Sequence, residues 1–155
     1  MDGVHLVDRL LLIMGSDVDS VSAMVGNPVY PEVPADDTSM ALMRWRSGKV
    51  ATISRYAYRS GVTLYGADFF LTKGQIKFRI SYGSQGETGV WTGENGEFSK
   101  VDVPEFDSLE RQFSEFMAAV TEGREPPITA AHGRQVIEII EAMDKSSASG
   151  REVVL

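Results

Sequence analysis

The sequence predicts an α+β fold, in which one open, predominantly antiparallel sheet carries helices on one face. Three features support this prediction: an apolar helix at the start, a run of strands joined by tight turns, and two amphipathic helices near the end. Strands that are joined by two-residue turns must run antiparallel. The length of 155 residues suits one domain, residues 1–155, with a core of its own.

The first helix is expected over about residues 3–14, where apolar side chains cover most of the circumference. Gly15 provides a natural C-cap for this helix. A short strand over residues 20–25 follows. The segment 31–37, which contains two prolines, is expected to be an ordered loop and not a linker between domains.

A run of seven strands is predicted in the middle of the chain. The strands cover residues 38–46, 49–59, 62–66, 69–72, 75–81, 90–92 and 97–101. Ser47-Gly48 and Asn95-Gly96 are two-residue hairpin signals, and the second is the strongest in the chain. The glycine-rich segment 83–89 is expected to be a hairpin loop, because it joins strand to strand and lacks Gly-x-Gly-x-x-Gly spacing.

Two helices and a last strand are expected to close the chain. Asp107 and Glu110 form a capping box in front of apolar residues at helical spacing. Thr129 is expected to cap the last helix. Residues 146–150 are expected to form a loop and residues 152–155 the final strand.

The strands 38–46 and 49–59 carry apolar or aromatic side chains on both of their faces. An antiparallel sheet that is covered only by its own helices should have one polar face. We therefore expect a partner sheet to cover the second face, which makes that open face the interface of a homo-oligomer.

Composition excludes several classes of function. The net charge of −7 argues against nucleic acid as a partner and against docking on an anionic membrane. The absence of cysteine excludes disulfides, thiolate metal sites and cysteine nucleophiles, and it fits the cytoplasm. No apolar stretch approaches the roughly 20 residues that span a bilayer, and no signal peptide is recognisable. We expect a soluble, cytoplasmic protein.

His5 and Asp8 are the best candidates for chemistry, because they lie one helical turn apart on the same face. A neutral imidazole can accept or relay a proton, and a nearby carboxylate can orient it. Taken alone, the pair is more typical of the exposed first turn of a buried helix. An unrelated small α+β enzyme that uses the pair as acid and base is a further alternative.

The other candidates are weaker. His132 is expected to be a solvated histidine in the first turn of the last helix, and no metal-binding motif joins it to His5. Arg55 and Tyr56, in a strand of alternating basic and aromatic residues, suit a polyhydroxylated or anionic small ligand and equally an oligomer interface. No phosphate loop or strand–glycine–helix unit occurs, so no cofactor site is expected on this chain.

Five segments, in their order along the chain, resemble the C-terminal domain of the Gfo/Idh/MocA oxidoreductases, the relatives of glucose–fructose oxidoreductase and inositol dehydrogenase. They are Gly3-Val4-His5-Leu6-Val7-Asp8 before an apolar helix, Val18 to Val25, Met40 to Ile53 with Ser47-Gly48-Lys49-Val50-Ala51, Phe113-x-x-Phe116 leading to Gly123-Arg124-Glu125-Pro126-Pro127, and the end of the chain, Ala142 to Ser146 and then Gly150 to Leu155. This resemblance covers nearly the whole chain.

The resemblance implies an NAD(P)-dependent dehydrogenase of sugars or cyclitols, whose N-terminal Rossmann domain binds the nicotinamide and supplies a lysine. His5 matches the family's catalytic histidine and Asp8 the acidic residue after it. The resemblance therefore favours a catalytic role for the pair, whereas the residues alone favoured the exposed first turn of a buried helix. Met1 stands where the family has an aspartate, and the Rossmann domain, its lysine and the first helix and strand of the C-terminal domain have no counterpart here.

The resemblance therefore implies an N-terminally truncated domain that supplies the substrate side of an active site and the oligomer interface. Such a chain is expected to be inactive when isolated, and a separate Rossmann domain or subunit would bind NAD or NADP. The alternative is a stand-alone, non-catalytic binding or oligomerisation module that kept the fold.

Overall fold

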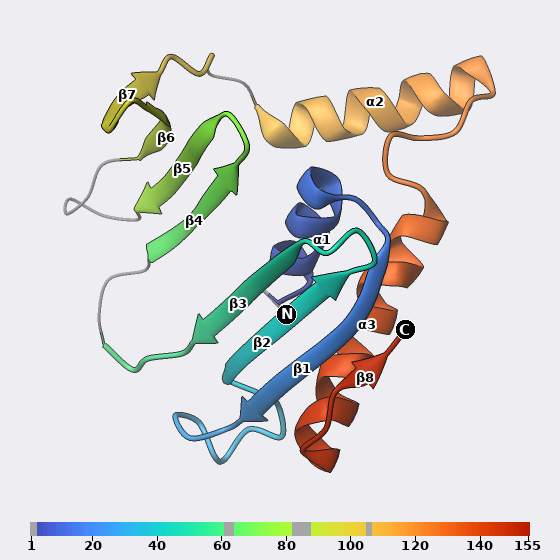
Figure 1. Ribbon diagram of the computed structural model, residues 1–155. Helices are drawn as coiled ribbons and strands as arrows, with labels where there is room; N and C mark the ends of the chain where they lie inside the picture. The colour runs from blue at the N-terminus through green and yellow to red at the C-terminus, as the bar shows by residue number, and fades with distance from the viewer. Residues whose placement is uncertain (1–2, 61–63, 82–87, 105–106) are drawn as a thin grey trace. The chain divides into compact units, whose positions relative to one another are not determined.

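A computed structural model describes residues 3–60, 64–81, 88–104 and 107–155 of the protein (Figure 1). The described residues form three helices and two four-stranded antiparallel sheets, which confirms the α+β prediction. Contacts divide the chain into two compact units, Met1–Arg59 with Ser114–Leu155, and Ser60–Phe113.

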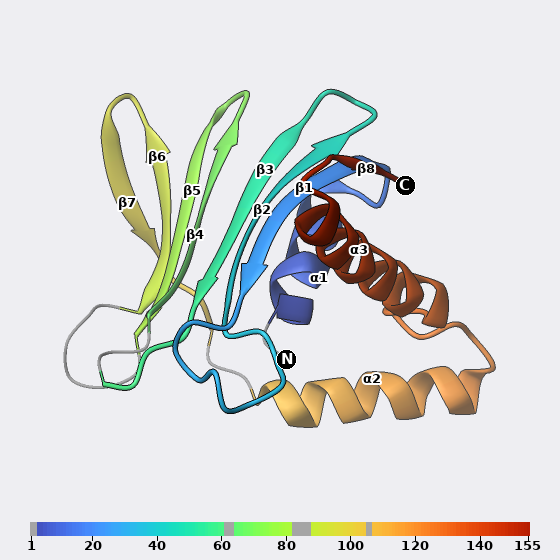
Figure 2. The same ribbon diagram turned by 90° about the horizontal axis from the view of Figure 1, so that it is seen from below.

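The first unit consists of one sheet with strand order β3-β2-β1-β8 and the helices α1 and α3. Its elements are α1 (Gly3–Met14), β1 (Val18–Gly26), β2 (Thr38–Trp45), β3 (Val50–Tyr56), α3 (Ala130–Ser149) and β8 (Val153–Val154). Figure 2 shows α1 and α3 on the same face of this sheet. The predicted packing of helices on one face is therefore confirmed for these two helices.

The core of the first unit lies between that face and the two helices. Along β2, Ala41, Met43 and Trp45 are buried, whereas the residues between them are exposed, as expected for a strand with one covered face. The remaining buried apolar side chains are Val7, Leu11, Val18, Val21, Ile53, Val136, Ile139, Ala142 and Met143. Trp45 also donates a hydrogen bond from Nε1 to the carbonyl of Gly15, at 2.7 Å.

Helix α3 continues through the segment that the sequence predicted as a loop. The helix ends at Ser149, and Gly150 forms its left-handed C-cap with φ of 66°. The hydroxyls of Ser146 and Ser147 accept hydrogen bonds from the backbone N–H groups of Ala23 and Val25, both at 2.9 Å. The loop prediction for 146–150 was wrong because these serines bind the backbone of β1 and do not break the helix.

The second unit is a four-stranded sheet with order β4-β5-β6-β7. Its strands are β4 (Leu64–Leu71), β5 (Gly74–Ser81), β6 (Gly89–Glu94) and β7 (Glu97–Val101). The predicted Asn95-Gly96 turn is confirmed, with both residues at positive φ. Strand β4 is continuous where the sequence predicted two strands. Most of the predicted loop 83–89 lies outside the described residues.

The structure contains two sheets where the sequence predicted one. Residues 57–63 lie between β3 and β4, so these strands lack the two-residue turn that forces neighbours to pair. Each sheet instead consists mainly of hairpins between successive strands.

Helix α2 (Ser108–Glu122) begins as predicted, because the Asp107 carboxylate accepts hydrogen bonds from the N–H groups of Leu109 and Glu110. Ala119 is the residue of α2 that is buried. The apolar residues at helical spacing are exposed, namely Leu109, Phe113, Phe116, Met117 and Val120. Among the described residues, no helix is both long enough and apolar enough to cross a membrane.

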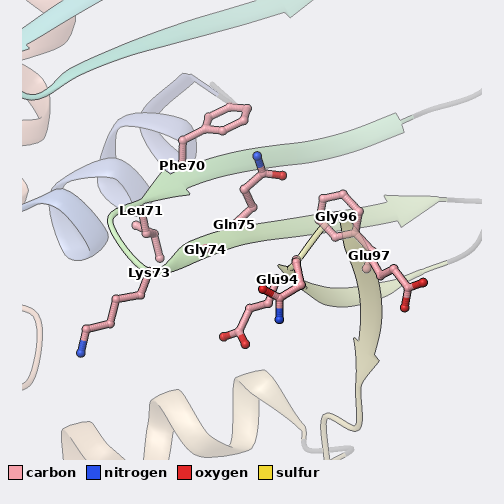
Figure 3. A pocket seen from close by; sticks show the side chains of 11 residues that line it. Phe70, Leu71, Lys73, Gly74, Gln75, Glu94, Gly96 and Glu97 are labelled. Atoms are coloured by element: carbon pink, nitrogen blue, oxygen red, sulfur yellow. The ribbon is translucent and has the colours of Figure 1, made fainter.

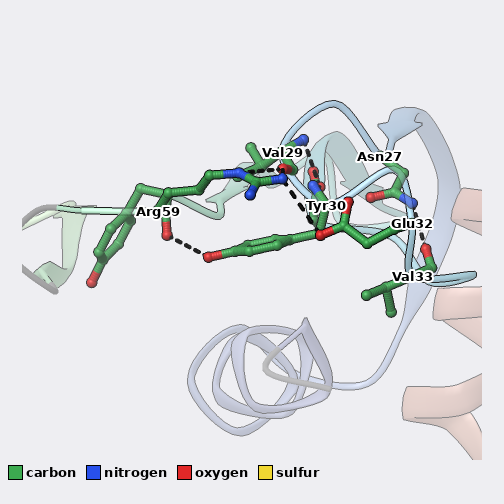
Figure 4. Close-up of polar contacts among 8 residues, drawn as sticks. Asn27, Val29, Tyr30, Glu32, Val33 and Arg59 are labelled. Carbon is green, nitrogen blue, oxygen red and sulfur yellow. Dashed lines mark hydrogen bonds and ion pairs between the residues drawn. The ribbon is translucent and has the colours of Figure 1, made fainter.

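The loop between β1 and β2 is ordered around the buried carboxylate of Asp37, as predicted for segment 31–37. Asp37 Oδ2 accepts hydrogen bonds from the N–H groups of Val29 and Tyr30, both at 2.7 Å. The Arg59 guanidinium donates to the Val29 carbonyl and lies over the Tyr30 ring (Figure 4). Burial raises the pKa of Asp37. The hydrogen bonds that the Asp37 carboxylate accepts and the charge of Arg55 lower this pKa more, so it lies below its ordinary value.

We expect Asp37→Asn to destabilise the chain at neutral pH, because the amide removes the charge that the backbone N–H groups bind. A carboxyl group whose pKa is lowered in the folded state stabilises the fold at pH values above its unfolded-state pKa, near 3.8. This contribution is lost as the pH falls through the folded-state pKa. The difference between wild type and variant should therefore shrink in acid. Urea unfolding at about pH 7 and below the unfolded pKa measures both effects.

The exposed Asp102→Asn serves as the matched control and should leave the unfolding midpoint unchanged. Equal midpoints for wild type and Asp37→Asn at neutral pH would contradict the prediction.

Candidate functional site

His5 lies on the exposed face of α1. The opposite face of this helix buries Val7 and Leu11 in the core. His5 and Leu12 remain exposed because their positions point away from the sheet and from α3. The imidazole of His5 is therefore accessible to a ligand.

Asp8 lies one turn further along α1 and contacts α3. Its Oδ1 is 2.5 Å from Nε2 of His132, and the two side chains are 36% and 17% exposed. The His132 backbone N–H donates to Oγ1 of Thr129, the predicted N-cap of α3, at 3.2 Å. The cap fixes the first turn of α3 and thereby presents His132 to Asp8.

The prediction that His132 is a solvated first-turn histidine was wrong. Within the described part of the chain, the recorded partner of Asp8 is His132, and no hydrogen bond of His5 is recorded. Sequence reasoning missed this contact because 124 positions separate the two residues and no motif links them. A carboxylate can accept several hydrogen bonds, so Asp8 can bind His132 and still accept one from a ligand hydroxyl.

Arg55 and Tyr56 lie on opposite faces of β3. Arg55 shares the face of buried Ile53 and donates to the carbonyl of Asp36, at 3.3 Å. Tyr56 is 56% exposed on the other face of the sheet. The structure does not bring this pair together.

The described residues do not fit a nicotinamide dinucleotide. Such cofactors bind where parallel strands alternate with helices, at a glycine-rich turn that opens a helix, whereas both described sheets are antiparallel. In the described part of the chain, no group of three His, Cys, Asp or Glu side chains is placed to hold a metal ion.

Comparison with known proteins places the chain in a family. The family model for the C-terminal alpha/beta domain of the Gfo/Idh/MocA oxidoreductase family matches residues 1–155. The chain belongs to this family. This finding confirms the resemblance seen in the sequence motifs. No curated protein sequence matches the chain.

Solved structures of oxidoreductases share the fold of this Gfo/Idh/MocA domain. Aldose–aldose oxidoreductase from Caulobacter crescentus, in complex with glycerol, is 18% identical with a TM-score of 0.82, over 99% of this chain and 46% of that one. An oxidoreductase from Agrobacterium radiobacter, in complex with NAD+, L-tartaric acid and magnesium, is 23% identical with a TM-score of 0.79, over 98% and 47%. WlbA dehydrogenase from Bordetella pertussis, with NADH and UDP-GlcNAcA, is 19% identical with a TM-score of 0.74, over 99% and 44%.

The chain therefore spans slightly less than half the length of these proteins. At such identities the similarity establishes the fold, and the chemistry has to be argued from the residues of this chain.

Proposed function

We propose that this Gfo/Idh/MocA domain is the substrate-side and oligomerisation part of an NAD(P)-dependent oxidoreductase that acts on sugars or cyclitols. The observation that carries the proposal is the exposed His5 beside Asp8, whose carboxylate is tied to α3 through His132. Oxidation of an alcohol releases the proton of its hydroxyl group. The imidazole of His5 accepts this proton, and Asp8 accepts a hydrogen bond from a neighbouring hydroxyl.

On this proposal the isolated chain is inactive. Oxidation requires a hydride acceptor next to the substrate carbon, and the described residues do not fit a dinucleotide. A separate Rossmann domain or subunit supplies NAD or NADP. The role of this chain is to bind and orient the polyol.

The proposal is tested by NMR of the imidazole groups, because the chain contains only two histidines. We expect myo-inositol or D-glucose, at millimolar concentrations, to shift the imidazole signals of His5 in a saturable way. The His132→Gln variant assigns the two sets of signals. Asp8→Asn should weaken binding about tenfold, because it removes a charged hydrogen-bond acceptor.

Asp17→Asn is the control, since Asp17 is an exposed acidic residue in the loop before β1. NADH should cause no saturable change in any signal. Imidazole signals that do not respond to either polyol would contradict the proposed function. Saturable binding of NADH would contradict the assignment of cofactor binding to a separate Rossmann domain or subunit.

The partner that we propose for the open face of the first sheet is a second copy of this chain. That face carries large apolar side chains that are between 52% and 79% exposed, namely Met24, Met40, Leu42, Val50, Tyr56 and Val154. Apolar groups that gather on one face in this way are typical of interfaces and uncommon on monomers. A sheet face also pairs readily with its own copy about a two-fold axis.

A further inference from the structure

One face of the β4–β7 sheet is lined by glycines, and side chains from neighbouring strands lie flat across it. Gly66, Gly89 and Gly93 share this face, which we call the glycine face. A Cβ atom on these residues would lie 2.8 Å from Arg79 Cδ, 2.9 Å from Lys100 Cε and 2.8 Å from Phe98 Cε1, respectively. The glycines thus make room for a level surface of planar and cationic groups.

Cations and aromatic rings alternate across the glycine face. Lys77 Nζ lies 4.5 Å from the centroid of the Phe98 ring, and Lys100 Nζ lies 5.7 Å from that of Trp91. Arg79 donates two hydrogen bonds to the carboxylate of Asp68, at 2.7 and 3.0 Å. Along the described strands this face therefore has three cations for one carboxylate. The described strands thus gather cations on this face of a chain whose net charge is −7.

The glycine face meets a groove at the end of the sheet where the two hairpin turns lie. The groove has a volume of about 460 Å³ (Figure 3). Its lining includes Phe70, Gln75 and Phe98, with Lys73 as its cation and Glu94 and Glu97 as its carboxylates. This volume suits a small molecule. Phe70 and Gln75 are cross-strand partners and point to the same side of the strands.

We propose that the groove and the adjoining glycine face bind an anionic carbohydrate, such as a sugar acid or a sugar phosphate. The C–H face of a sugar ring packs on the exposed rings of Phe70 and Phe98, and the Gln75 amide binds hydroxyl groups. Lys77, beside Phe98, then binds the anionic group, with Lys100 as the next cation along the face.

The net charge of −7 disfavours a long polyanion, which favours a small ligand with one anionic group. None of these residues belongs to the proposed His5 site, so the inference goes beyond the proposed function.

Tryptophan fluorescence tests the proposal, because the chain has two tryptophans and Trp45 is buried in the other unit. Trp91 is the cross-strand partner of both Lys77 and Lys100. We expect D-glucuronate and D-glucose 6-phosphate to change its fluorescence in a saturable way at millimolar concentrations. D-Glucose, which lacks the charge, and inorganic phosphate, which lacks the sugar ring, should each bind at least about tenfold more weakly.

Lys77→Gln should weaken binding of both anionic sugars about tenfold, since it removes a charged hydrogen-bond donor. Lys145→Gln, the same change at an exposed lysine of α3, should have no effect. The proposal is overturned by any of four results: no saturable response, equal affinity in Lys77→Gln, phosphate alone binding as tightly as the sugars, or a response that persists in Trp91→Phe. A Trp91 signal that depends on protein concentration without ligand would assign the face to a second copy and overturn it as well.

Discussion

Replacing Trp45 by alanine is expected to lower the free energy of unfolding by about 3–5 kcal/mol, the usual range for removing a buried aromatic side chain. Trp45 is 1% exposed, and it is the largest of the fully buried side chains. Its indole N–H also satisfies the carbonyl of Gly15, just after the end of α1. The substitution therefore leaves a cavity and an unpaired carbonyl at the junction of α1 with the sheet.

The change is measured as the shift of the urea unfolding midpoint, monitored by circular dichroism. Leu12→Ala, a truncation at an exposed position of α1, is the matched control and should stay within about 0.5 kcal/mol of wild type. Trp45→Phe keeps part of the ring volume and loses the hydrogen bond, so it should fall between wild type and alanine. A midpoint in Trp45→Ala that equals the control would show that Trp45 does not support the core.

The parts of the fold that sequence reasoning predicted correctly are those that depend on neighbouring residues. The helix over residues 3–14, the Asn95-Gly96 turn and the caps at Asp107 and Thr129 follow from local hydrogen bonding and allowed backbone angles. Each of these signals lies within a few residues of the feature that it predicts. For this reason they do not depend on the rest of the fold.

The predictions that failed depended on contacts between distant segments. A serine-rich segment is typical of a loop, but Ser146 and Ser147 bind N–H groups of β1 beyond the short strand β8. His132 resembled a solvated histidine because nothing near it in sequence reveals Asp8. Both contacts exist because α3 packs along the sheet and α1, and periodicity predicts such a helix without predicting its neighbours.

The candidate site divides in the same way. His5 was recognised from a local motif, and the structure places it on an exposed helical face. The contact of Asp8 with His132 of α3 is seen only in the structure, and it changes the interpretation of Asp8. This carboxylate is held by His132 instead of His5, so on the proposed function the imidazole of His5 stays available to the substrate.

The open face of the first sheet leads to the second large expected effect. Leu42 is 61% exposed on β2, and its cross-strand partners are Ser22 on β1 and Thr52 on β3. If a second copy covers this face, Leu42→Lys buries a charge without a partner. Self-association should then weaken by roughly 100-fold, or about 2–3 kcal/mol. Sedimentation equilibrium over a range of concentrations measures this change.

Ile137→Lys is the matched control, because Ile137 is 50% exposed on α3, outside the open sheet face. Both variants exchange an exposed apolar side chain for lysine, so any general effect of added charge appears in both. Loss of association in Leu42→Lys alone identifies the sheet face as the interface. A wild-type chain that sediments as a monomer at high concentration, or equal losses in the two variants, would refute the assignment. Equal losses would make the exposed apolar residues of α2 the next surface to test by the same exchange.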